Sequence, residues 1–328
     1  MDTLGIATST LNGYVSTEVI DNAHAAIPFF WFLTGRKGMY DRASRKFTEK
    51  SSVKYVDGGE YIQVNLRLGT NTTAKSHGPY DVVDTTPQST LNYLLYNWKE
   101  TSVQITISNK EKRINKGRAA LFNLLNDKIN EAEDSLFEAM NTMLFGDGTG
   151  NESKDILGLG AIVNTTGTIG GLSRTTYPQL QCQNESTAMA LAISGGAGSL
   201  TNMWNNLYKS KKLWKPDVHI TTQTLAEKYE SLLAPNMRFA DKESANMGWD
   251  FLTFKGAPII FDDQCPAGYW YMLNTRFINM VIHPDADFAS VPFAKPVNQK
   301  VSVGSIEFMG QLTCSNFQRQ GRLTGKTA

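Results

Sequence analysis

The residue types best suited to metal chemistry stand close together in one short segment, His283-Pro284-Asp285-Ala286-Asp287. An imidazole and two carboxylates are ligands that can hold a divalent ion. The same segment also fits the end of a strand followed by a Pro–Asp turn, in which the Asp side chain bonds its own backbone. We favour the turn. The alternative is a metal-dependent hydrolase that uses His283, Asp285 and Asp287.

Other catalytic patterns are incomplete in this sequence. The four histidines form no HExxH motif, and no GxSxG nucleophile pattern occurs. Gly325-Lys326-Thr327 imitates the end of a phosphate-binding loop, but Gln320 stands where that motif needs its first glycine. The run from Gly195 to Ser199 precedes a predicted helix and could bind an anion, although a flexible connector is the favoured interpretation. The sequence therefore predicts no catalytic, cofactor-binding or metal-binding residues.

Composition narrows the function further. The chain has 328 residues, of which 41% are hydrophobic and 19% are charged, with a formal net charge of +1. This balance excludes a disordered chain, and it lacks the basic surplus of proteins that bind duplex DNA tightly. Cys182, Cys265 and Cys314 are widely spaced, so we expect buried free thiols in a reducing compartment. The most apolar stretch, Ala25–Leu33, is too short to span a bilayer, so no membrane segment is expected.

The spacing of apolar residues predicts a mixed α+β chain. Leu121, Leu125, Ile129, Leu136 and Met140 follow three- and four-residue steps and predict a long helix over 117–145. Two further helices are predicted, at 200–214 and from Thr224 to just before Pro235. The strands are predicted at 91–108, 256–263, 269–274, 277–283 and 301–317.

Two apolar segments lack obvious cover within the chain. A hairpin is predicted in which 53–56 turns at Asp57-Gly58-Gly59 into an alternating return strand, and its flanks are polar. Because an isolated two-stranded hairpin is marginal in water, we expect another copy of the chain to cover it. The segment Ala25–Leu33 is expected to be buried against a distant segment of the chain or against a neighbouring subunit. The predicted inter-subunit contacts are Phe29, Phe30, Trp31, Tyr55, Ile62, Val64, Leu66 and Leu68.

Several stretches, taken in their order along the chain, resemble the major capsid proteins of tailed bacteriophages. Ile107–Glu111 followed by Leu124–Ile129 is similar to the entry to that family's spine helix. Leu144–Gly150 resembles the exit from that helix, and Phe254–Ile259 resembles part of the axial domain. Met309–Asn316 is similar to the final strand of the peripheral domain. The family has the Hong Kong 97-type fold.

The resemblance implies a division of the chain into five segments. They are an N-terminal arm (1–40), an extended β-hairpin loop (41–90), a peripheral domain (91–154) with the spine helix at 117–145, a mixed α/β axial domain (155–290) and returning peripheral strands (291–328). It further implies a structural subunit, not an enzyme, without cofactors, that forms hexamers and pentamers of an icosahedral head.

The implied head encloses double-stranded DNA without sequence-specific binding. The expected location is the virion, after assembly in the host cytoplasm. A separate scaffolding protein and a portal are expected partners, and decoration proteins remain an open alternative. An encapsulin-like nanocompartment shell, which encloses protein cargo, is the alternative of the same fold, and no membrane partner is expected.

Overall fold

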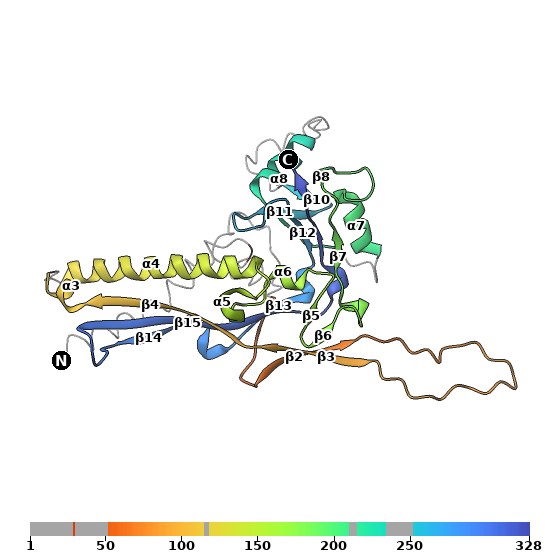
Figure 1. Cartoon of the computed structure of the whole chain (residues 1–328), viewed down its shortest axis with the longest axis horizontal. Helices are drawn as coiled ribbons and strands as arrows, with labels where there is room; N and C mark the ends of the chain where they lie inside the picture. The colour runs from red at the N-terminus through yellow and green to blue at the C-terminus, as the bar shows by residue number, and fades with distance from the viewer. Residues whose placement is uncertain (1–28, 30–51, 115–117, 210–214, 234–251) are drawn as a thin grey trace.

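The computed structural model describes Phe29 and residues 52–114, 118–209, 215–233 and 252–328. The described chain is elongated (Figure 1). A long helix and long strands run to one side of a compact part, and a thin two-stranded projection extends to the other. Helices and strands are mixed along the chain, which confirms the predicted α+β class. None of the helices in these ranges is both long enough and apolar enough to cross a membrane.

A five-stranded sheet, which we call the long sheet, underlies the elongated part. Its central strand β15 (Val301–Cys314) pairs antiparallel with β4 (Lys99–Ser108) along ten residues, from Val301 opposite Ser108 to Gly310 opposite Lys99. The other strands are β1 (Val53–Tyr55), β13 (Ile278–Ile282) and β14 (Ala289–Ala294), in the order β1-β13-β15-β14 with β4 also on β15.

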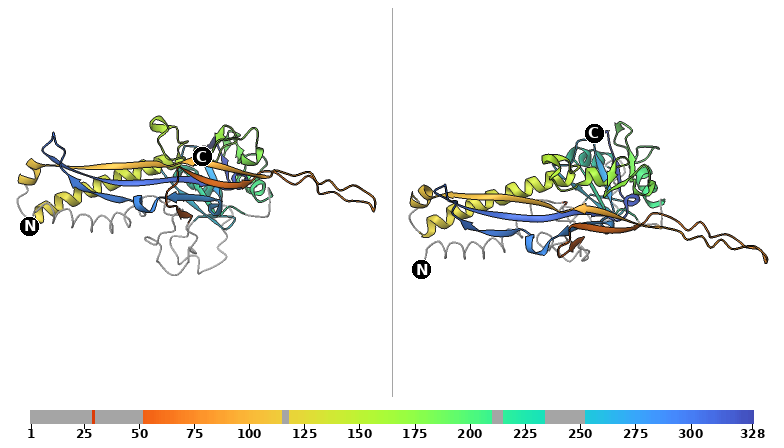
Figure 2. Two further views of the ribbon diagram at one scale, coloured as in Figure 1. Left: turned by 90° about the horizontal axis from the view of Figure 1, so that it is seen from below. Right: turned by 60° about the horizontal axis from the view of Figure 1, so that its bottom comes forward.

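Helix α4 (Arg118–Phe145) runs along the strands β4 and β15 (Figures 1 and 2). Its start and end confirm the long helix predicted over 117–145. Ile129, Leu136, Met140 and Leu144 are buried and belong to the main core of the molecule. They recur at steps of seven, four and four residues, which return to one face of a helix. The helix is therefore held to the sheet by one apolar stripe.

The chain turns sharply after α4, and Gly158 packs against the end of that helix. A Cβ atom at Gly158 would lie 2.6 Å from the carbonyl oxygens of Leu144 and Gly146, and closer still to that of Met143. These are backbone atoms of the last helical turn and of the residue that follows the helix, so they cannot move aside as a flexible side chain would.

We expect Gly158→Ala to lower the free energy of unfolding by about 2 kcal/mol or more, since overpacking against a fixed backbone is costly. Denaturant unfolding of the full chain measures this change. Gly69→Ala is the matched control, because its Cβ would meet its nearest neighbour, Thr90, at an ordinary 3.4 Å. Equal stabilities of the two variants would contradict the proposed close packing.

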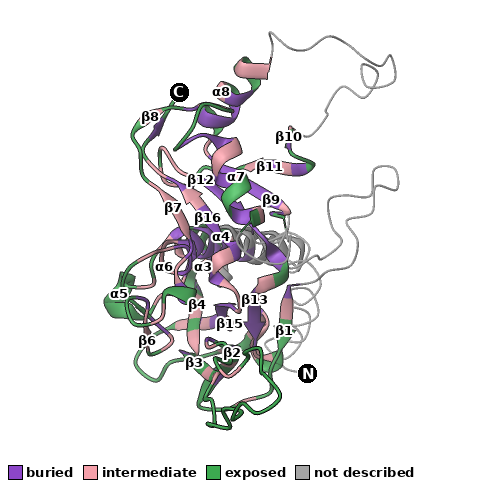
Figure 3. Ribbon diagram, turned by 90° about the vertical axis from the view of Figure 1, so that its right-hand side faces the viewer, coloured by how far each residue is buried: buried purple, intermediate pink, exposed green. Residues whose placement is uncertain are grey.

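A six-stranded sheet, which we call the compact sheet, forms the second part. Its order is β10 (Thr253–Phe254), β11 (Ala257–Phe261), β9 (Val218–Thr221), β12 (Trp270–Leu273), β16 (Gly321–Leu323) and β7 (Gln183–Glu185). Helices α7 (Leu200–Lys209) and α8 (Gln223–Leu233) lie beside it (Figure 3). Helix α8 and the strands β11 to β13 agree with the predicted elements, and α7 agrees as far as Lys209, since 210–214 lie outside the described residues. A second apolar cluster, which includes Leu207, Tyr229 and Trp270, joins the helices to the sheet.

Short elements complete the described chain. They are α3 (Asn109–Ile114), α5 (Gly150–Ser153), α6 (Leu159–Ile162), β5 (Thr168–Ile169), β6 (Leu172–Ser173), β8 (Met189–Ala190) and β17 (Lys326–Thr327), with 3₁₀ turns at Pro178–Leu180, Thr275–Phe277, Pro284–Ala286 and Phe317–Arg319. Strand β17 pairs in parallel with β8, so the end of the chain is tied to the compact part.

The predicted hairpin around Asp57-Gly58-Gly59 is wrong. Strand β1, before this turn, pairs in parallel with β13 of the long sheet. Strand β2 (Tyr61–Arg67), after the turn, pairs antiparallel with β3 (Leu91–Asn97). Gly58 and Gly59 have φ of 80° and 100°, so the turn itself was correctly recognised. The predicted strand over 91–108 is divided into β3 and β4 at Trp98, because its first half belongs to this second hairpin.

Candidate assembly surface

The projection consists of β2, β3 and the connection 68–90 between them, and it extends well beyond the body of the molecule (Figure 1). The strands pair from Tyr61 opposite Asn97 to Arg67 opposite Leu91. The pairing ends where Leu68 and Gly69 both donate their backbone N–H to the carbonyl oxygen of Thr90. A two-stranded ribbon has two faces, and side chains alternate between them.

One face of the projection is covered by the chain itself. Ile62, Leu66, Leu94 and Tyr96 are buried on this face. The tight turn between β5 and β6 packs directly on it, since a Cβ at Gly170 would lie 2.6 Å from that of Leu94. The backbone N–H of Leu95 also donates to the carbonyl oxygen of Gly170 at 3.1 Å. The base of the projection is therefore fixed to the body of the molecule.

This burial corrects part of the predicted contact set. Ile62, Leu66 and Leu68 are buried within their own chain, so they present little surface to a neighbour. Phe29 is likewise fully buried and packs against Phe145 at the end of α4, with ring centroids 5.8 Å apart. Their cover was not visible in the sequence because it comes from distant segments. Phe30 and Trp31 lie outside the described residues.

The opposite face of the projection is exposed, and on it large apolar side chains of β3 lie beside the polar Gln63, Asn65 and Arg67 of β2. Leu91 is 69% exposed, Tyr93 is 55% exposed, and Tyr61 and Leu95 are also exposed. A hydrogen bond with Glu60 raises the pKa of Tyr61. Several large apolar side chains that are close together on one strand ribbon are typical of a protein contact surface. Leu91, Tyr93 and Leu95 are not among the contacts predicted from the sequence, although their alternation in LNYLLYN is a usable signal.

The connection 68–90 adds further exposed apolar side chains at the far end. Tyr80 and Val82 are almost fully exposed, and Val83 is about half exposed. Local hydrogen bonds shape this segment: Asp81 accepts the backbone N–H of Gly78 at 2.6 Å. Asp84 accepts both the backbone N–H and the hydroxyl of Thr86, which lowers the pKa of its carboxyl. Tyr80 and Val82 therefore stand out from a polar, turn-rich segment.

Tyr55 and Val64, the remaining predicted contacts, lie in different places. Val64 is partly buried on the covered face of the projection, opposite Leu94. Tyr55 is half exposed on the edge strand β1, and its hydroxyl donates to the Asp287 carboxylate at 3.0 Å. Of these two residues, Tyr55 offers the greater surface to a neighbour.

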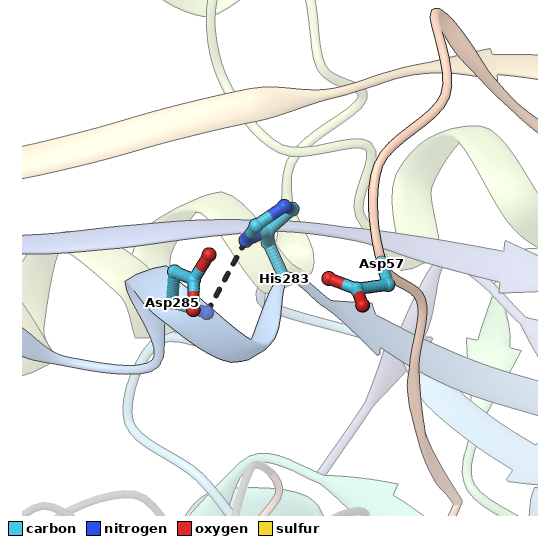
Figure 4. A group of neighbouring side chains, drawn as sticks. All are labelled: Asp57, His283 and Asp285. Carbon is cyan, nitrogen blue, oxygen red and sulfur yellow. Dashed lines mark hydrogen bonds between the residues drawn. The ribbon is translucent and has the colours of Figure 1, made fainter.

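The candidate metal segment forms a turn, as favoured from the sequence. Strand β13 ends at Ile282, and Pro284–Ala286 forms a 3₁₀ turn that His283 caps. The bonding side chain differs from the predicted aspartate: it is that of His283, whose Nδ1 accepts the backbone N–H of Asp285 at 3.2 Å (Figure 4). One ligand atom each from Asp57, His283 and Asp285 lies within 4.8 Å of the others. In this group of possible metal ligands, Asp57 therefore stands where Asp287 was predicted.

The hydrogen bonding of His283 argues against metal binding. With Nδ1 accepting a hydrogen bond, the neutral ring carries its proton on Nε2, by inference from that bond. Neither nitrogen then offers a free lone pair to an ion. The ring also lies edge-on to Trp98, whose Nε1 donates to the carbonyl oxygen of Gly59. These contacts join the turn after β1 to the end of β13, which is a structural role.

The other candidate motifs also have structural partners. Ser199 caps α7, since its hydroxyl accepts the backbone N–H of Asn202 at 3.2 Å, which agrees with a connector that leads into a helix. The three cysteines are buried free thiols, as predicted, and burial raises the pKa of each to about 12. Lys326, the lysine of the imitated phosphate loop, is buried and donates to the carbonyl oxygen of Thr187.

No protein-family model and no curated protein matches this chain. Its structure resembles the cyanophage A-1(L) capsid asymmetric unit, with a TM-score of 0.65, 16% identity, and coverage of 92% of this chain and 93% of that chain. It also resembles the capsid of a native GTA particle (TM-score 0.54, 12% identity, coverage 89% and 98%). A third match is the SrpI encapsulin complex of Synechococcus elongatus (TM-score 0.54, 9% identity, coverage of 84% of this chain and 85% of that chain). The chain therefore has the Hong Kong 97-type capsid fold.

Proposed function

We propose that this chain is the major capsid protein of a tailed phage, a structural subunit that assembles into a closed icosahedral shell around double-stranded DNA. The observation that carries the proposal is the exposed face of the projection with its large apolar side chains, on a chain with a capsid fold. That face lies on a ribbon that extends away from the body, where a neighbouring subunit can cover it. Closed rings of identical chains use such head-to-tail contacts.

The proposed contact surface is made of residues from both strands of the projection and its far end. Tyr61, Leu91, Tyr93 and Leu95 form its base, Tyr80 and Val82 extend it, and Tyr55 on β1 is a further contact. The proposed assemblies are hexamers and pentamers. A near-neutral chain suits a shell whose DNA is held by enclosure, because tight phosphate binding needs a basic surplus.

The partners and places of assembly follow from the same proposal. A separate scaffolding protein would guide the shell to one size, a portal would occupy one vertex, and assembly would take place in the host cytoplasm before the virion is complete. The five segments implied by the sequence resemblance remain the proposed domain division, with the projection starting at β2. An enzymatic role is not part of the proposal.

An encapsulin-like compartment is the second candidate. It is favoured by the similarity to the SrpI encapsulin, whose TM-score of 0.54 equals that of the GTA capsid. Electron microscopy of the expressed chain, alone and together with the products of neighbouring genes, separates the candidates. We expect closed shells that protect DNA from nuclease when the packaging components are present. Shells filled with a protein cargo would favour the compartment, and a chain that stays monomeric at high concentration would exclude both. Uniform shells from the chain alone would exclude the need for a scaffold.

A further inference from the structure

One polar pair is buried where the long helix meets the compact sheet. Asp262 directly follows β11, and its backbone N–H donates to the carbonyl oxygen of Thr221 on β9. Asn141 lies in the last turns of α4. The residues are 3% and 9% exposed, respectively. The Nδ2 group of Asn141 donates to Oδ1 of Asp262 at 2.9 Å, so this bond joins residues 121 positions apart.

One oxygen of each side chain has no hydrogen-bond partner among the described residues. Oδ1 of Asp262 accepts a second bond, from the backbone N–H of Gln264 at 3.0 Å. By contrast, Oδ2 of Asp262 and Oδ1 of Asn141 are both buried without a hydrogen-bond donor among the described residues. An unpaired buried oxygen is costly, and an unpaired buried carboxylate is more so. Two such atoms in one bonded pair call for a shared explanation.

The surroundings of Asp262 disfavour a negative charge. Burial raises the pKa of this carboxyl, and the charge of the adjacent Asp263 raises it further, against the smaller lowering effects of the bonds from Gln264 and Asn141. The other titratable group close by is the buried thiol of Cys265, whose own pKa is raised to about 12. From α4 the facing groups are the uncharged side chains of Asn141 and Thr142. No cation among the described residues acts on this carboxyl.

A single proton accounts for both unpaired oxygens. A carboxylic acid and an amide can form a ring of two hydrogen bonds, in which the amide N–H donates to one oxygen and the acid O–H donates to the amide oxygen. We propose that Asp262 is a neutral acid whose Oδ2–H donates to Oδ1 of Asn141, which makes the pair a proton-dependent clasp between α4 and the compact sheet.

The clasp gives the chain a defined response to pH. The folded state binds the proton of Asp262 more tightly than the unfolded state does, in which an aspartate has a pKa of about 3.9. The contribution of Asp262 to the free energy of unfolding is therefore complete below about pH 4. It is lost as the pH rises through the raised pKa of the folded state. His219 has the opposite effect on stability. Burial lowers its pKa to about 4, so its contribution lowers the free energy of unfolding as the pH falls below its ordinary pKa of about 6.5.

The test is thermal unfolding of the full-length chain across pH, for the wild type, Asp262→Asn and Asp263→Asn. The amide of Asp262→Asn can donate to Asn141 as the acid does, so its melting temperature should equal or exceed that of the wild type at neutral pH. It should also lack the fall with rising pH, which we expect to be about 2 °C or more in the wild type. Asp263→Asn removes a neighbouring exposed carboxylate and should keep most of that fall. The contribution of His219 is common to all three proteins.

A uniform loss of stability in Asp262→Asn, with the pH dependence of the wild type retained, would show that Asp262 is ionised and overturn the proposal. A rise in melting temperature on adding calcium, seen in the wild type and not in Asp262→Asn, would assign the site to a cation instead. Infrared spectroscopy gives a second measurement that needs no stable variant. The wild type should show the C=O band of a buried carboxylic acid at neutral pH, and absence of that band would also overturn the proposal.

Discussion

Replacing Leu91 and Tyr93 together with aspartate is expected to abolish closed shells while leaving the chain folded. Both side chains lie on the exposed face of the projection, so a monomer should tolerate the change, as it does most surface substitutions. In an assembled shell the same positions would be buried against a neighbour. Two unpaired carboxylates there would each cost several kcal/mol, which is enough to prevent the contact at micromolar concentration.

The measurement is electron microscopy together with size-exclusion chromatography of the expressed variant. Far-ultraviolet circular dichroism and the melting temperature establish that the chain is folded. A conservative double variant, Leu91→Ile with Tyr93→Phe, is the matched control, because it keeps the apolar surface and should still form shells. Shells of wild-type size and yield from the double aspartate variant would exclude this face as an assembly contact.

Truncating Trp270 to alanine should cause the largest loss of stability in the compact sheet, about 3–5 kcal/mol. Its side chain is fully buried in β12. The indole packs on Tyr229 of α8 with centroids 5.7 Å apart, and its Nε1 donates to Nδ1 of His219 at 3.5 Å. The other nitrogen of His219 bonds the carbonyl oxygen of Phe254 at 3.2 Å. Removing the indole therefore leaves a cavity and an unpaired imidazole nitrogen.

Denaturant unfolding followed by fluorescence and circular dichroism measures the change. Phe261→Ala is the matched control, since this phenylalanine lies on the strand β11 of the same sheet but is 57% exposed. Its cost should stay within about 1 kcal/mol. Similar costs for the two variants would mean that the cluster around Trp270 does not stabilise the compact part as described.

The elements that the sequence predicted correctly are those with a local signal. Helix α4 was recognisable because its apolar residues repeat at the helical period over many turns. Strands such as β13 and β15 were recognisable from short apolar or alternating runs bounded by turn residues. The strand partners were not, since pairing depends on segments far apart in the chain: β1 lies beside β13, more than 200 residues later.

The candidate surface was only partly predictable for the same reason. Ile62 and Leu66 alternate with polar residues, and the pattern correctly predicted that one face of β2 is buried. It could not show that the distant turn at Gly170 provides the cover. In β3 both faces carry large apolar side chains, so periodicity alone could not decide whether Tyr93 or Leu94 faces solvent. The bond between Asn141 and Asp262 left no trace in local sequence.

The position of β15 along the chain has a consequence for biosynthesis. This strand pairs with β4, β13 and β14, yet it spans residues 301–314 of 328. Until its codons have been translated, the three earlier strands lack their main partner. A nascent chain on the ribosome must therefore keep unpaired strand edges apart, and pairings between such distant segments form slowly. Completion of the long sheet is thus tied to the synthesis of β15, and a product truncated before this strand should aggregate.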